Sequence, residues 1–154
     1  MFRTVANICV SFFLGICLKA NDLTDDLSFY ASFDKGFSPD FSLGSNRTEV
    51  TKGASQIKAM RGNGMYLTKS FNYAASGNLE YSGGTISFWF RIPKEAQKKN
   101  VTLVGTTNFQ LTWYPQKQTF CFMTGRTVPK SGYDWDYQVA YRVRDVDLAD
   151  WHHV

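Results

Sequence analysis

The chain has 154 residues, of which 16% are aromatic and 19% charged, and its formal net charge is +4. So low a charged fraction argues against a disordered chain, and the length is enough for one domain with a buried core. Aromatic residues favour half-buried, pleated surfaces, so the composition favours an all-β fold. Without residues 1–20, the chain has 15 basic and 13 acidic residues. This near-neutral balance gives no support to nucleic-acid binding.

Residues 1–20 have the pattern of a secretory signal peptide. Arg3 precedes an uncharged, mostly apolar run from Val5 to Leu18, and Ala20 is suited to the last position before cleavage. The run is shorter than the about 20 residues that a membrane span needs. An uncleaved anchor and a lipoprotein modified at Cys17 are the alternatives. We therefore expect a secreted protein, extracellular or periplasmic, with no transmembrane span after removal of this segment.

In the first half of the chain, alternation and glycine turns predict short strands. Residues 27–33 place Leu, Phe, Ala and Phe on one face, which predicts a half-buried strand, and residues 38–52 are predicted to be a loop. Further strands are predicted at 65–67 and 78–81. In the strand predicted at 86–92, Phe88 and Phe90 lie on one face and Trp89 on the other. A strand that is apolar on both faces belongs in the middle of a packed sheet.

The second half continues the pattern. An exposed connection is predicted at 94–100 and a strand at 101–106. Strands 109–114 and 119–124 are predicted to form a hairpin across a four-residue loop. Residues 125–136 are predicted to be a longer loop, followed by strands at 138–143 and 151–154. Short strands separated by turn residues at this spacing indicate a sandwich or a barrel.

Four segments together resemble the laminin G-like, concanavalin A-like lectin/glucanase jelly roll: Ser32–Asp34, Gly62–Leu67, Gly84–Arg91 and Asp150–Val154. The resemblance covers roughly residues 27–154 and implies an antiparallel two-sheet jelly-roll sandwich. In that family the strand similar to the last segment lies mid-domain. The resemblance therefore implies that residues 21–154 form an incomplete laminin G-like domain, whose C-terminal strands are missing and whose core surface and strand edge are exposed.

No catalytic residues are predicted. Enzymes of this fold family hydrolyse glycans with carboxylates spaced as Glu-x-Asp-x-Glu, which places two of them on one strand face. The chain's glutamates, Glu49, Glu80 and Glu95, have no such spacing. The pairs Asp134/Asp136 and Asp145/Asp147 are spaced two residues apart, but they lie in or beside predicted loops, so we interpret them as surface turn residues.

The predicted ligand-binding surface is an aromatic row. In an extended segment Tyr133, Trp135 and Tyr137 share one face, where their rings could stack on sugar rings while Arg126 bonds hydroxyl groups. The alternative is that the three rings pack on the sandwich and anchor a loop.

Metal binding and modification have weaker support. His152 and His153 are adjacent on a predicted strand and so face opposite ways, which prevents them from sharing a metal. The resemblance implies calcium as an occasional ligand, with Asp34, Asn63 and Asp134 as oxygen donors by type. Cys121, the one cysteine left after residue 20, is predicted to be a buried free thiol. The alternative is a disulfide to a cysteine beyond residue 154. In a secreted eukaryotic protein the N-glycosylation motifs would place surface acceptors at Asn46 and Asn100, whereas in a bacterium they have no meaning.

The sequence thus predicts a secreted or cell-surface module that binds a glycan or an extracellular protein without catalysis. Two alternatives stay open. One is a glycoside hydrolase or lyase, or its accessory module, with catalytic carboxylates beyond residue 154. The other is a structural adhesion domain.

Overall fold

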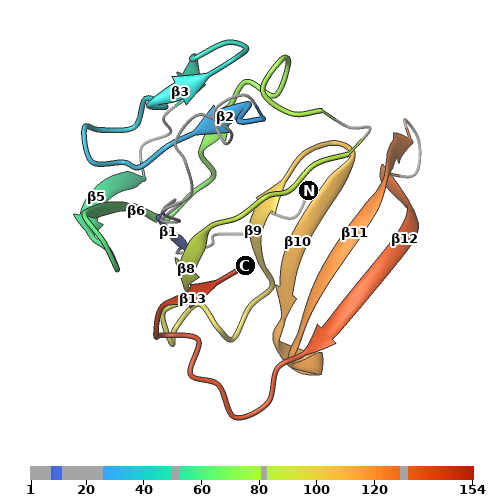
Figure 1. Cartoon of the computed structure of the whole chain (residues 1–154). Coiled ribbons are helices and arrows are strands. Elements are labelled where there is room, and N and C mark those ends of the chain that lie inside the picture. The colour runs from blue at the N-terminus through green and yellow to red at the C-terminus, as the bar shows by residue number, and fades with distance from the viewer. Residues whose placement is uncertain (1–7, 12–25, 50–52, 81–82, 129–131) are drawn as a thin grey trace.

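The computed structural model describes residues 8–11, 26–49, 53–80, 83–128 and 132–154 (Figure 1). Strands and connecting turns make up these residues, with a 3-10 turn η1 (Pro115–Lys117) and no α-helix among them. Two larger antiparallel sheets dominate the structure. The prediction of an all-β fold is confirmed.

The sheets have simple orders. The first contains, from one edge to the other, β13 (His152–His153), β8 (Trp89–Arg91), β1 (Ile8–Ser11), β6 (Asn63–Leu67) and β5 (Ala54–Lys58). The second contains β12 (Gly132–Arg142), β11 (Thr119–Val128), β10 (Phe109–Tyr114) and β9 (Val101–Gly105). Two short ribbons, β2 (Phe29–Tyr30) with β3 (Phe41–Ser42) and β4 (Thr48–Glu49) with β7 (Asn72–Tyr73), complete the described strands.

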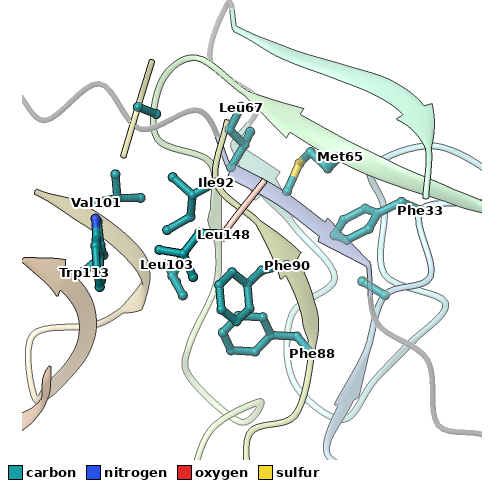
Figure 2. Close-up of a cluster of buried hydrophobic side chains, with 12 residues drawn as sticks. Phe33, Met65, Leu67, Phe88, Phe90, Ile92, Val101, Leu103, Trp113 and Leu148 are labelled. Atoms are coloured by element: carbon teal, nitrogen blue, oxygen red, sulfur yellow. The ribbon is translucent and has the colours of Figure 1, made fainter. Parts of the chain in front are cut away.

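Strand β8 lies inside the first sheet, between β13 and β1, as its two apolar faces predict. Phe88, Phe90 and Ile92 are buried in the core between the two sheets (Figure 2). The Phe90 ring meets the Phe120 ring of the second sheet edge-on, with centroids 5.5 Å apart, and Trp113 lies 5.1 Å from Phe120. These contacts make the two sheets a sandwich.

The sandwich is incomplete on the side of β12. Val139 and Tyr141 pair with Phe122 and Phe120 of β11, yet their side chains are 68% and 73% exposed. An apolar groove of about 380 Å³ lies between this face and β13, and the described residues that line it include no lysine, arginine or acidic residue. Among the described strands, none covers this half of the second sheet.

Two predicted segments are wrong. Residues 125–136 are not a loop, because the β11–β12 hairpin continues to Val128 and resumes at Gly132. Residues 78–80 are not in a strand, and residue 81 of the predicted strand lies outside the described part of the chain. Asn78 lies in a turn, and its buried side chain bonds four backbone and side-chain groups instead of facing one side of a sheet. Pattern alone cannot detect such long-range hydrogen bonds.

Two other predictions hold in part. The strand predicted at 27–33 is only the two-residue β2, because the backbone turns at Phe33, which has a φ of 64°. The inward positions are nevertheless correct, since Ala31 and Phe33 are fully buried. The loop predicted at 38–52 contains the short strands β3 and β4.

Within the predicted signal peptide, residues 8–11 form β1 in the first sheet. The rest of residues 1–20 lies outside the described part of the chain, so the signal peptide remains a prediction. None of the described residues belongs to a helix long and apolar enough to cross a membrane.

Asn78 yields a stability prediction. Its Oδ1 accepts the Gly44 N–H (2.8 Å) and the Ser42 hydroxyl (2.9 Å), and its Nδ2 donates to Ser45 O (2.8 Å) and Ala74 O (2.9 Å). Since Asn78 is only 2% exposed, Asn78→Ala leaves buried partners unsatisfied and should lower the free energy of unfolding by about 2–4 kcal/mol.

Urea unfolding measures this loss. Asn72→Ala, at an exposed asparagine of β7, is the matched control and should change stability by about 0.5 kcal/mol or less. Equal losses in the two variants would show that the Asn78 network does not stabilise the fold.

Candidate functional site

The connections β8–β9, β10–β11 and β12–β13 lie towards the same end of the sandwich (Figure 1). Residues of all three line a polar hollow of about 720 Å³. We call it the rim pocket. Its lining consists of Gln97, Trp113, Pro115, Gln116, Lys117, Gln118, Arg142, Val143, Arg144, Asp145, Val146 and Leu148.

The β10–β11 turn forms one wall of the rim pocket. Pro115 begins η1 with a fixed φ, and Gln118 ends it in the left-handed region with a φ of 48°. The Gln118 N–H donates to Pro115 O (3.1 Å), and Gln118 O accepts the Val143 N–H (2.9 Å). The turn is thereby held against the end of β12.

Trp113 fixes the part of the β8–β9 connection that lines the rim pocket. This buried side chain of β10 donates from Nε1 to Gln97 O (3.0 Å), and Gln97 Nε2 donates to Ile92 O (2.7 Å). The β8–β9 connection is therefore tied both to the end of β8 and to the second sheet. A pocket supported in this way is formed before a ligand arrives, which reduces the entropy lost on binding.

The charge of the rim pocket is positive. Lys117, Arg142 and Arg144 are exposed on its wall, and Asp145 is the only acidic residue among the described residues that line it. The side-chain amides of three glutamines add neutral donors and acceptors. Arginine binds planar anionic groups with two parallel hydrogen bonds, so this set suits a ligand with carboxylate, sulfate or phosphate groups and hydroxyl groups beside them.

Two residues with strained backbone conformations line the rim pocket. Among the described residues, the non-glycine residues with positive φ are Phe33, Gln118 and Asp145, and the last two line the rim pocket. Such conformations cost about 1–3 kcal/mol and are concentrated at functional sites. The strain favours the rim pocket as the candidate site.

The carboxylate of Asp147 makes local contacts beside the rim pocket. Its carboxylate accepts the Ala149 N–H at 2.9 Å and forms an ion pair with Lys94 at 3.3 Å. The Ala149 N–H, with Lys94 second, holds the pKa of Asp147 below its usual range. Of the Asp145/Asp147 pair, only Asp145 lines the pocket.

The predicted aromatic surface is only partly described. Tyr137 is 76% exposed, whereas the side chains of Arg126, Tyr133 and Trp135 lie outside the described part. The backbone register shifts at this point, since Tyr137 pairs with Thr124 and Trp135 with its neighbour Gly125. Continuous alternation therefore does not run through the segment, and the aromatic surface remains a prediction.

The histidines face different partners, as expected. His152 Nε2 lies 2.9 Å from Asp147 O, whereas His153 Nε2 lies 2.9 Å from the Ser87 hydroxyl, and the His153 ring packs on Trp89. Among the described residues, no group of three histidine, cysteine or acidic side chains is arranged to hold a metal.

The two described residues among the predicted calcium ligands bond each other. Asp34 Oδ1 accepts the Asn63 N–H at 2.7 Å, which closes the glycine turn before β6. The side chain of Asp134 lies outside the described part. These contacts indicate a structural role for Asp34 and Asn63, and calcium binding remains a prediction.

Two predictions about single residues can be placed on the structure. Cys121 is a buried free cysteine, as predicted. Asn46 and Asn100 are both exposed, as glycosylation acceptors must be.

The sequence interpretation missed the rim pocket. Its basic residues are scattered over the β10–β11 turn, the end of β12 and the β12–β13 connection, and none belongs to a recognisable motif. The available signal was topological: in a chain that runs up and down a sandwich, alternate connections meet at one end. Lys117 in one connection could have been grouped on that basis with Arg142, the last residue of β12, and with Arg144 in the connection that follows it.

Asp147→Asn should change the pH dependence of stability. Because the folded pKa is lowered, the carboxylate stabilises the fold above its unfolded pKa of about 3.9 and loses this effect as the pH falls through the folded value. The melting temperature of Asp147→Asn should therefore be lower than that of the parent at pH 7, and the gap should close in acid.

Thermal unfolding from pH 2 to pH 7 measures this gap. When Lys94→Ala is introduced into both the parent and the Asp147→Asn variant, the difference in melting temperature should become smaller but persist. The reason is that the Ala149 N–H still donates to the Asp147 carboxylate of the parent. A gap that is the same at every pH would contradict the role given to this carboxylate.

Comparison with known proteins adds no relative. No family model, no curated protein and no solved structure matches this chain. The all-β sandwich is therefore established by the structure alone, and any narrower assignment must be argued from the residues.

Proposed function

We propose that this protein is a non-catalytic binding module that recognises an anionic glycan in its rim pocket. The observation that carries the proposal is the positive, preformed hollow of about 720 Å³, in which Lys117, Arg142 and Arg144 outnumber Asp145. Carboxylate or sulfate groups of a sugar chain would pair with the arginines, and ring hydroxyls would bond the glutamine amides.

Binding is favoured over hydrolysis by the number of carboxylates in the rim pocket. Glycoside hydrolysis generally uses two, one as acid and one as base or nucleophile. Among the described residues, the lining supplies Asp145 alone.

The sequence resemblance agrees with this function. A laminin G-like jelly roll exported by a cleaved signal peptide would meet glycans outside the cell or in the periplasm. Exposed acceptors at Asn46 and Asn100 fit the same setting.

An extracellular protein is the second candidate ligand, on a different observation. Val139 and Tyr141 are exposed and line the apolar groove. Exposed apolar surface of this kind is typical of protein contacts. In this case the module would serve adhesion or assembly.

Titration calorimetry with a sulfated hexasaccharide and its desulfated counterpart tests the glycan proposal. The sulfated form should bind, and added salt should weaken binding because exposed charges are screened. Arg142→Ala and Arg144→Ala should each weaken binding about tenfold, equivalent to about 1.4 kcal/mol.

Lys58→Ala is the matched control, since Lys58 is an exposed cation at the end of β5, the far edge of the first sheet. It should leave the dissociation constant unchanged. Equal binding of both sugars, or an equal effect of all three substitutions, would overturn the assignment to the rim pocket.

A further inference from the structure

Strand β1 occupies a central place in the first sheet although it comes from the predicted signal peptide. It is antiparallel to both neighbours, with Val10 opposite Met65 of β6 and opposite Phe90 of β8. Figure 1 shows β1 between these two strands. Without β1, the sheet would separate into the pairs β13–β8 and β6–β5.

The place of β1 adjoins the main core. Met65 and Leu67 on one side and Phe90 on the other are buried members of the same cluster (Figure 2). An empty gap there would expose these side chains and two rows of unpaired backbone groups. Exposed strand edges of this kind bind further strands.

The register specifies the pattern of a suitable strand. Positions 8 and 10 lie opposite Leu67, Met65 and Phe90, which are buried, so apolar residues suit both positions. Position 9 lies opposite Tyr66 and Arg91, which are only half-buried, and so tolerates other residues. The required occupant is thus an extended segment with apolar residues at alternate positions.

We propose that the gap between β6 and β8 is a strand-acceptor site. The chain's own residues 8–11 fill it as long as they are attached. Once they are removed, the site binds an extended polypeptide strand with the same alternating apolar pattern. Loss of a signal peptide after residue 20 would then open a binding site as well as release the protein.

The backbone hydrogen bonds of β8 show which residue pairs across β1 are hydrogen-bonded and which are not, and this determines where a disulfide can test the position of β1. Phe88 exchanges both backbone hydrogen bonds with Val154 (2.9 and 3.1 Å), so Trp89 and Arg91 direct their N–H and C=O groups away from β13, towards β1. Cys9 and Arg91 are therefore the hydrogen-bonded pair. Cys9 and Tyr66 form the non-hydrogen-bonded pair, in which Cα atoms are only about 4.5 Å apart.

The first experiment is disulfide trapping in the full chain. Tyr66→Cys, with Cys17→Ser to remove a competing thiol, should form an intramolecular disulfide to Cys9 on mild oxidation. Mass spectrometry of unreduced peptides identifies the link. Ser55→Cys is the control: Ser55 faces Tyr66 from the other side on β5, so β6 separates it from β1 and no link should form.

The second experiment weakens β1 in the full chain. Val10→Pro removes a backbone donor from a central strand and should lower the melting temperature. A synthetic peptide of residues 6–13 with Cys9→Ser should restore it with rising concentration, whereas the same peptide carrying Val10→Pro should not.

Each of the following results would contradict a part of the proposal. No Cys9 link with Tyr66→Cys would overturn the placement of the strand, even if Val10→Pro fails to fold. A link only between two chains would overturn the assignment of the chain's own strand. An unaltered melting temperature in Val10→Pro, or equal rescue by both peptides, would overturn the acceptor site.

Discussion

The burial of one face of β8 against the second sheet is the contact on which the rest of the structure depends. Phe90 packs edge-on against Phe120, which in turn contacts Trp113. Phe88 and Ile92 extend this row along the core. Because apolar burial is the dominant favourable contribution to folding, the row aligns the two sheets and brings their connecting turns to common ends.

The candidate binding site is a consequence of this alignment. Trp113 belongs to the core and also donates a hydrogen bond that fixes Gln97 at the rim pocket. The turn that carries Lys117 is held against Val143, directly beside Arg142 and Arg144. Lys117 is thus brought to the same pocket as Arg142 and Arg144, which lie 25 or more residues away in the sequence.

The sequence predicted well those features that depend on the alternation of apolar and polar residues along a strand. The inner place of β8, the hairpin between Trp113 and Phe120, and the buried positions of Ala31 and Phe33 all follow from spacing of apolar residues. Prediction from the sequence failed for segments whose structure depends on residues that are far away in the sequence. Asn78 is in a turn because partners more than 30 residues away satisfy its amide. The rim pocket could not be predicted from local pattern, since its residues meet only after the sheets have packed.

A double-mutant cycle on Phe90 and Phe120 tests the packing of the two sheets most directly. The free energy of unfolding would be measured for Phe90→Ala, Phe120→Ala and the double variant. Rings in this geometry should be coupled by about 0.5–1.5 kcal/mol, so the double variant should lose less than the sum of the single losses. Additive losses would mean that the rings do not touch and that the sheets do not face each other as described.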